Sequence, residues 1–298
     1  MSTAKTITNV IAFTNQKGGC GKTTTSVSLA AGIARAGHSV AIIDIDPQCN
    51  ATDSFGLNRE ELLAQGRFTV ADAYLAGRGM SEILLAFNGR FGGKLSVVPG
   101  HRGLSSVPQR LESELQLAVA KEEAAEIDAD EIRNEHRHRL KRSIETLSGQ
   151  VEYVLIDTPP DLGFLMTTAL IAADHFVIPV FPSGYDLKGL ETLMKTVERV
   201  QARLNSKLRL LGVVLGNVDS TARLDADIQQ MLRTKFGEDR VFQTTISRSV
   251  KHREAPVYGK TIFEHAPGQT PANQFADLTA EVVGRLSIPK ANRTEQHA

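Results

Sequence analysis

A short run of glycines and lysines near the N-terminus has the residue types and the spacing that bind phosphate. Residues 17–24 read Lys-Gly-Gly-Cys-Gly-Lys-Thr-Thr and lie between an apolar segment and a segment with helical spacing. Glycines let the backbone curl so that successive N–H groups point at one anion, and the following helix adds the positive end of its dipole. We expect Lys22 to reach the β- and γ-phosphates of a nucleotide and Thr23 to ligate Mg²⁺.

The loop departs from the ordinary pattern G-x-x-x-x-G-K-[ST] at its first position, where Gln16 stands. A second lysine, Lys17, begins the loop instead. The alternative interpretation is a glycine turn with unrelated lysines. We disfavour it because strand, loop, Lys-Thr pair and helix occur together in the order that phosphate binding requires.

Three aspartates at the ends of apolar segments extend this site. Asp44 and Asp46 stand at the end of segment 40–44, and Asp157 follows segment 153–156. Ligands of a parallel sheet bind outside the carboxyl ends of its strands, so we expect these carboxylates beside the loop, where Mg²⁺ and the attacking water must be held. The alternative for Asp157 is a strand-end residue that caps a turn.

The elements that must position these side chains alternate along the chain. Continuous apolar strands are predicted at 10–13, 40–44, 95–98, 153–156, 175–180, 210–215 and 240–245. Helices are predicted at 23–37, 187–204, 224–236 and 273–286. Because continuously apolar strands separated by helices indicate a sheet covered on both sides, we predict an α/β fold with a doubly wound, mostly parallel sheet and helices on both faces.

The length and the charge pattern indicate one domain with two peripheral segments. A single domain is expected over 1–288, followed by a flexible polar tail over 289–298. Residues 112–148 are a charged insertion, acidic in the first part and basic in the second, with apolar residues at helical spacing. We interpret the insertion as helices with a solvated face, and a partner-binding arm is the alternative.

The composition excludes several classes of protein. The 298 residues carry 34 Lys and Arg against 34 Asp and Glu, and this zero net charge argues against bulk electrostatic wrapping of nucleic acid. Two cysteines cannot make a disulfide framework, no apolar run approaches the roughly 18 residues of a membrane span, and no apolar signal segment precedes the first strand. We therefore expect a cytoplasmic protein.

Several motifs resemble the ParA/MinD superfamily of P-loop NTPases, whose phosphate loop is a deviant Walker A motif. The segments that carry the resemblance are 14–25 for that loop, 43–48 and 155–160 for the second and third motifs, 178–180 and 189–190, and 247–256. The last of these is similar to chromosome-type ParA proteins in particular. The resemblance runs from Thr6 to Leu286 and is interrupted by the charged insertion.

The resemblance implies an ATPase with weak basal turnover that binds ATP and Mg²⁺ and forms a homodimer around two ATP molecules. Lys17 would reach the partner's nucleotide, and Asp46 would position the attacking water, so Lys17, Asp46 and Lys22 are the implied catalytic residues. The implied Mg²⁺ residues are Thr23, Asp44 and Asp157. The implied ATP contacts are Lys17, Gly18, Gly19, Cys20, Gly21, Lys22, Thr23, Thr24 and, near the adenine, Asn217. For Asn217 a turn residue is the alternative.

Members of the superfamily bind different surfaces, and this sequence favours DNA. The chain does not end in the basic apolar helix with which MinD-type proteins bind membrane, so no membrane partner is expected. Basic residues that could neutralise DNA phosphates without reading bases fall within six positions: Arg248, Lys251, His252 and Arg253. Arg223 is a weaker candidate. The alternative is a salt-bridged surface loop with Glu254.

Together these features predict a nucleoid-associated ATPase. We expect it to dimerise with ATP, bind double-stranded DNA without sequence preference, and position or segregate DNA or another large cargo. A ParB-like or other adaptor protein would stimulate hydrolysis. The alternative is a positioning or scaffold ATPase of the same superfamily that does not bind DNA and uses ATP mainly as a dimerisation switch.

Overall fold

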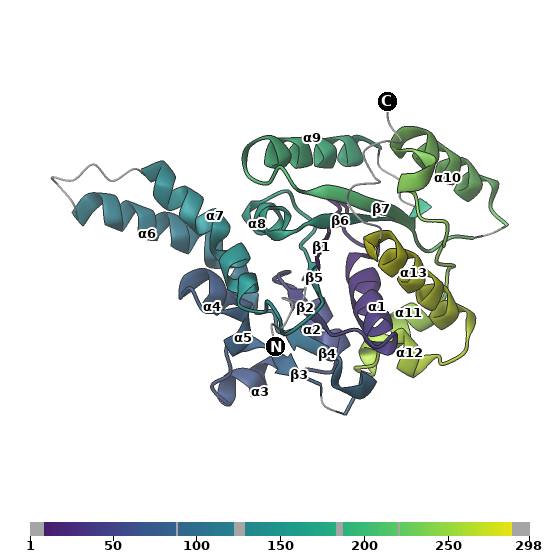
Figure 1. The fold of residues 1–298 in the computed structure, drawn as a ribbon, viewed down its shortest axis with the longest axis horizontal. Helices are drawn as coiled ribbons and strands as arrows, with labels where there is room; N and C mark the ends of the chain where they lie inside the picture. The colour runs from purple at the N-terminus through teal and green to yellow at the C-terminus, as the bar shows by residue number, and fades with distance from the viewer. Residues whose placement is uncertain (1–8, 88, 122–128, 183–186, 220, 288–298) are drawn as a thin grey trace, which may run out of the picture.

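The fold is built on a central seven-stranded sheet with the order β3-β4-β2-β5-β1-β6-β7 (Figure 1). The computed structural model describes residues 9–87, 89–121, 129–182, 187–219 and 221–287. The strands are β1 (Asn9–Phe13), β2 (Val40–Asp44), β3 (Leu85–Ala86), β4 (Leu95–Val98), β5 (Tyr153–Asp157), β6 (His175–Val180) and β7 (Arg209–Leu215). Neighbouring strands are parallel except for the β3–β4 pair, so the prediction of a mostly parallel sheet is confirmed.

Helices cover both faces of the sheet, as predicted. Alternate residues of β1 show the division, because Ile11 and Phe13 belong to one hydrophobic core and Ala12 belongs to the other. The first core takes residues from α1 (Lys22–Arg35), α12 (Ile262–His265) and α13 (Thr270–Ser287). The second takes residues from α4 (Val70–Leu75), α7 (Ala129–Glu145), α8 (Phe164–Ala172), α9 (Leu187–Arg203) and α10 (Arg223–Phe236).

Helix α1 follows the phosphate loop and ends where its sequence indicates. Gly37 adopts a left-handed φ of 93° just after the helix. Its N–H donates to the carbonyl oxygen of Ala34, and the N–H of His38 donates to that of Ile33. This pair of bonds satisfies the last carbonyls of the helix, which is why a glycine at this position stops it.

The charged insertion forms two helices that extend away from the body of the molecule (Figure 1). They are α6 (Val107–Lys121) and α7 (Ala129–Glu145), so the helical segment begins before residue 112. Leu111, Leu140 and Ile144 are buried and join the second core, which anchors the base of the pair. Farther along α6, Leu117 is 60% exposed.

The remaining helices of the described chain are short. They are α2 (Asn50–Ser54), α3 (Arg59–Ala64), α5 (Met80–Ile83) and α11 (Lys251–Val257), with 3₁₀ turns η1 (Phe91–Gly93), η2 (Arg102–Ser106) and η4 (Glu238–Arg240). None of the helices in the described ranges is both long and apolar enough to cross a membrane. The tail predicted over 289–298 lies outside the described residues.

The prediction of a strand over 240–245 is wrong. This segment forms one isolated bridge with β7, between Val241 and Val213, and just beyond it Ser247 bridges Val218 after the end of β7. The reason is a carboxylate from α13. The N–H of Phe242 donates to Val213 in β7, so the next N–H directed at β7 would be that of Thr244. Glu281 accepts that N–H at 3.1 Å, and the ladder does not continue.

Candidate functional site

The phosphate loop connects the carboxyl end of β1 to the start of α1, as the sequence predicts. Gly19 and Gly21 have left-handed φ values of 69° and 88°. Gly21 is required for a second reason, because a Cβ atom there would lie 2.6 Å from a ring carbon of Phe181. Glycine therefore meets both the backbone conformation and the close approach of the residue that follows β6.

Lys22 lies inside the curve of this loop. Its side chain is only 6% exposed, and its Nζ donates to the carbonyl oxygens of Asn15 and Lys17, each at 3.1 Å. Buried ammonium groups need such acceptors, and the oxygens of a nucleotide phosphate could replace them. Lys17 and the two glycines after it are exposed, so this part of the loop faces outward.

Asn15 fixes the loop against the neighbouring strand, a role that the sequence analysis missed. Its Nδ2 donates to the carbonyl oxygen of Pro179 at 2.7 Å, and its Oδ1 accepts from the N–H of Lys17 at 3.0 Å. The available signal was a polar amide two residues after the end of an apolar strand. Because its Nδ2 donates to β6 and its Oδ1 accepts from the loop, Asn15 holds the loop against β6.

Asp157 joins the third motif to the phosphate loop. Its carboxylate accepts from the Thr23 hydroxyl at 2.8 Å and from the Ser26 hydroxyl at 3.0 Å. Burial raises the pKa of Asp157, and the two hydroxyl donors oppose that rise. The structure therefore brings Thr23 and Asp157 together as expected. Ser26 was missed, although its position three residues after Thr23 places both on one side of α1.

Both carboxylate oxygens of Asp44 form hydrogen bonds within the chain. It is fully buried, and one carboxylate oxygen accepts from both the N–H and the hydroxyl of Thr52, at 2.8 and 2.7 Å. The other oxygen accepts from the N–H of Asp46 at 3.2 Å. Burial, and then the neighbouring Asp157, raise the pKa of Asp44. Both oxygens thus hold the chain between β2 and α2.

Asp46 belongs to the same cluster and is also buried, with 6% of its area exposed. Its Oδ1 accepts from the N–H of Gln48 at 2.9 Å, and burial raises its pKa. Among the described residues, no three His, Cys, Asp or Glu side chains are placed to hold a metal by themselves. The oxygens of Thr23 and Asp157, which are bonded to each other, suit Mg²⁺, which retains water and takes further ligands from phosphates.

The remaining loop and adenine candidates fall at the same edge of the sheet. Cys20 is buried and burial raises its thiol pKa, so it contributes to the loop through its backbone. Asn217 follows β7 and has a left-handed φ of 56°, the conformation of the turn-residue alternative. Gly216 beside it would meet the ring of Phe181 at 2.7 Å if it carried a Cβ. Phe181, missed in the sequence, therefore packs between the phosphate loop and the Asn217 turn.

The basic residues at the start of α11 are not equivalent. Arg248 and Arg253 are exposed, as is Arg223 at the start of α10, whereas Lys251 forms an ion pair with Glu254 at 2.8 Å. His252 packs edge-on against Phe275 with ring centroids 5.6 Å apart, and burial lowers its pKa. The expectation that His252 adds to the positive cluster is wrong because a buried imidazole is neutral near pH 7.

The segment that carries Arg248 is bonded to the Asn217 turn. The N–H of Arg248 donates to the carbonyl oxygen of Val218 at 2.9 Å, and the N–H of Val218 donates to that of Ile246 at 3.0 Å. The candidate DNA residue and the candidate adenine residue are thus held in one short paired segment. Their neighbour Asp219 has a lowered pKa because it accepts from Thr221, with a smaller contribution from Arg248.

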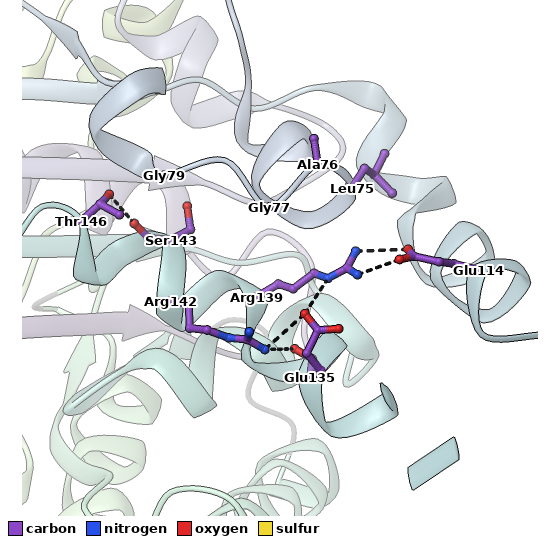
Figure 2. A pocket seen from close by; sticks show the side chains of 10 residues that line it. All are labelled: Leu75, Ala76, Gly77, Gly79, Glu114, Glu135, Arg139, Arg142, Ser143 and Thr146. Carbon is purple, nitrogen blue, oxygen red and sulfur yellow. Dashed lines mark hydrogen bonds and ion pairs between the residues drawn. The ribbon is translucent and has the colours of Figure 1, made fainter. Parts of the chain in front are cut away.

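A separate cavity lies between the α4–α5 turn and the α6–α7 pair (Figure 2). Its volume is about 400 Å³, and its charged lining consists of Glu114, Glu135, Arg139 and Arg142. Arg139 pairs with Glu114 at 2.8 Å and Arg142 with Glu135 at 3.3 Å. These charges compensate one another, and the cavity contains none of the residues that the sequence analysis assigned to a site.

Comparisons with known proteins agree with this arrangement. A family model described as an AAA domain matches residues 8–210. The chain is 36% identical to the sporulation initiation inhibitor protein Soj of Bacillus subtilis over 92% of this chain and 97% of that protein. It is also 36% identical to the chromosome-partitioning ATPase Soj of Thermus thermophilus, over 93% and 96% of the two chains.

Solved structures share the fold at lower identity. The ATP complex of a substituted Cyanothece McdA superposes with a TM-score of 0.76 at 20% identity, covering 94% of this chain and 98% of that one. Cobyrinic acid a,c-diamide synthase from Mycobacterium smegmatis, with a bound ATP analogue and magnesium, gives 0.73 at 24% identity, covering 94% and 96%. On its full-length relatives and its phosphate-loop architecture, this chain belongs to the Soj/ParA family of chromosome-partitioning and positioning ATPases.

Proposed function

We propose that this partitioning ATPase works as a switch that dimerises with ATP, binds DNA in that state and leaves it after hydrolysis. Lys22 and the backbone of residues 18–24 would hold the phosphates, and Thr23 would bind Mg²⁺ with Asp157 behind it. These roles are supported by the hydrogen bond between Thr23 and Asp157 and by the burial of Lys22 inside the loop. The bound Mg²⁺ would supply charge neutralisation at the β- and γ-phosphates.

We assign Lys17 and Asp46 to the steps of the ATPase cycle that follow ATP binding. Lys17 is exposed at the outward side of the loop, where a lysine could reach the nucleotide of a second subunit. The Asp46 carboxylate accepts from the N–H of Gln48 through Oδ1, and we assign this aspartate to positioning the attacking water. Asp44 would support the Mg²⁺ site indirectly, because both of its oxygens are already bonded to Thr52 and Asp46.

The observation that carries the DNA part of the proposal is the pairing of the Arg248 segment with the Asn217 turn. Nucleotide bound at Asn217 and DNA bound at Arg248 would then both contact this hydrogen-bonded pair of segments. Arg223, Arg248 and Arg253 present exposed guanidinium groups, which suit contacts to phosphate oxygens rather than to bases. A ParB-like or other adaptor would stimulate hydrolysis and release the protein from the nucleoid, moving the cargo.

The test is a salt titration of DNA binding by the ATP-bound protein. Each lost phosphate contact lowers the slope of log affinity against log salt by about 0.9. Arg248→Ala is expected to weaken binding equally on two unrelated duplexes. It is also expected to flatten the slope by the amount that about two phosphate contacts contribute per dimer, one from each subunit. Fluorescence anisotropy measures both quantities. Arg137→Ala, an exposed arginine on α7, is the matched control and is expected to retain the wild-type slope.

Two results would reject parts of this proposal. An unchanged slope in Arg248→Ala, with the dimer intact, would move the DNA surface to Arg223 or to the basic residues of α7. A wild-type protein that dimerises with ATP and binds no duplex would favour the alternative, a positioning ATPase that uses ATP as a dimerisation switch without DNA.

A further inference from the structure

Arg90 joins its own segment to two others that lie far from it in the sequence. Its Nε donates to one carboxylate oxygen of Glu264 at 2.8 Å, and a terminal nitrogen donates to the other. Its remaining donors reach the carbonyl oxygen of Phe55 at 2.9 Å and that of Gly259 at 3.4 Å. One guanidinium thus ties the end of α2 to the turn between α11 and α12 and to α12 itself.

The surroundings of Arg90 leave this connection little freedom. Its side chain is 22% exposed, and the rings of Phe55, Phe87 and Phe91 lie 5.9, 5.2 and 6.0 Å from the guanidinium carbon. Beside it, two turns meet backbone to backbone, because a Cβ atom on Gly259 would lie 2.7 Å from the Cα of Gly56. A shift of the α11–α12 turn therefore has to move the end of α2 as well.

The other end of α2 is bonded to segment 43–48, which carries Asp44 and Asp46. The N–H of Cys49 donates to the carbonyl oxygen of Asp46 at 2.8 Å, and Thr52 donates twice to Asp44. Helix α2 has five residues, so it is a single turn between Asp46 and Phe55. On the far side of Gly259, helix α11 begins at Lys251 and contains Arg253.

We propose that Arg90 is a positioning residue that couples α11 to Asp46, so that DNA held by the basic residues of α11 changes the rate of ATP hydrolysis. The inference rests on the proposed function, because DNA binding at α11 is itself proposed. Its physical basis is that a ligand shifts a conformation only when it binds two positions of an element unequally. Arg90 makes one position of α11 correspond to one position of the Asp46 loop.

The experiment compares turnover with and without duplex DNA in wild-type protein and in Arg90→Met. We expect Arg90→Met to keep ATP binding, ATP-dependent dimerisation and DNA affinity, because it touches none of the residues assigned to them. Its kcat is expected to fall, and addition of DNA is expected to leave kcat unchanged. The KM for ATP is expected to remain that of the wild type, which separates lost positioning from lost binding.

Arg285→Met is the matched control. Arg285 also pairs with a carboxylate, Glu281, donates to two carbonyl oxygens and stacks on a ring, with 19% of its side chain exposed. It connects α13 to β7 and lies outside the α2–α11 connection, so it reports the general cost of removing such an arginine. We expect Arg285→Met to retain the DNA response of the wild type.

Three results would overturn the coupling. These are a wild-type DNA response in Arg90→Met, an equal loss of that response in Arg285→Met, and a wild-type protein that binds DNA without any change in turnover. Arg90→Lys provides a second variant if Arg90→Met does not fold, because a lysine can keep the ion pair with Glu264 but cannot span to Phe55 as a fork. Failure of the proposed function looks different, since wild-type protein would then not bind DNA with ATP at all.

Discussion

The phosphate-loop edge and the α6–α7 pair both carry many charges, but they use them in opposite ways. At the loop edge, Lys22, Asp44 and Asp157 are buried; Lys22 donates to carbonyl oxygens, and each aspartate accepts from hydroxyl groups. On the α6–α7 pair, Arg139 and Arg142 neutralise Glu114 and Glu135 beside a cavity (Figure 2). Buried charges are costly to leave unpaired, whereas exposed ion pairs contribute little. The comparison teaches that charge density alone does not locate a site.

The strongest test of this contrast is Lys22→Ala. Loss of a buried ammonium that would contact phosphate is expected to weaken ATP binding by about 2–5 kcal/mol, or roughly 30- to 3,000-fold. Equilibrium binding of a fluorescent ATP analogue measures the loss. Lys17→Ala is the matched control, since it removes an exposed lysine from the same loop and is expected to retain ATP binding while hydrolysing poorly. Wild-type affinity in Lys22→Ala would refute the assignment of the phosphate site.

A smaller but more specific effect is expected for Asp46→Ala. The variant is expected to bind ATP and accumulate as a dimer, because water positioning is lost while the phosphate loop stays intact. Turnover is expected to fall by roughly 10²-fold or more. Size-exclusion chromatography with ATP and a phosphate-release assay check the two parts.

Asp46→Asn separates chemistry from structure at this position. The amide oxygen can still accept the N–H of Gln48, but the side chain has no negative charge. We expect Asp46→Asn to match Asp46→Ala in turnover. A monomeric Asp46→Ala protein at saturating ATP, or rapid turnover in Asp46→Asn, would contradict the role given to Asp46.

The smallest effect is expected on the α6–α7 pair, for Glu114→Gln. Glu114 is about half exposed, with 49% of its side chain accessible, so loss of its ion pair is expected to reduce the free energy of unfolding by about 0.2–1 kcal/mol. ATP binding is expected to be unchanged. Urea unfolding at pH 7 measures the difference, and a loss well above that range would show that the pair is structural.

The pH dependence of the same variant tests whether the ion pair stabilises the folded state above the pKa of Glu114 rather than below it. The hydrogen bond from Arg139 lowers the pKa of Glu114 below its value in the unfolded chain, about 4.3. The pair therefore contributes stability above that pH and loses it as the pH falls through the folded-state pKa. The difference between wild type and Glu114→Gln is expected at pH 7 and is expected to vanish below the folded-state pKa.

The sequence by itself determined the α/β order, the phosphate loop and the strand ends that carry Asp44, Asp46 and Asp157. These features depend on local patterns: continuous apolar strands, helical spacing, and glycines where the backbone is left-handed. The end of α1 at Gly37 is predictable for the same reason. The family resemblance added the roles of Lys17 and Asn217, which local chemistry cannot supply.

Only the tertiary structure decided which charged groups are available. The family resemblance gave Asp44 a place in the Mg²⁺ site, yet Thr52 and the N–H of Asp46 occupy both of its carboxylate oxygens. The sequence counted His252 as a cation, although both ring nitrogens are buried and the ring packs edge-on against Phe275. It predicted a strand at 240–245, where Glu281, 37 residues further along the chain, accepts the N–H of Thr244. Contacts between distant segments set burial and hydrogen bonding, and these fix whether a polar group is free to react.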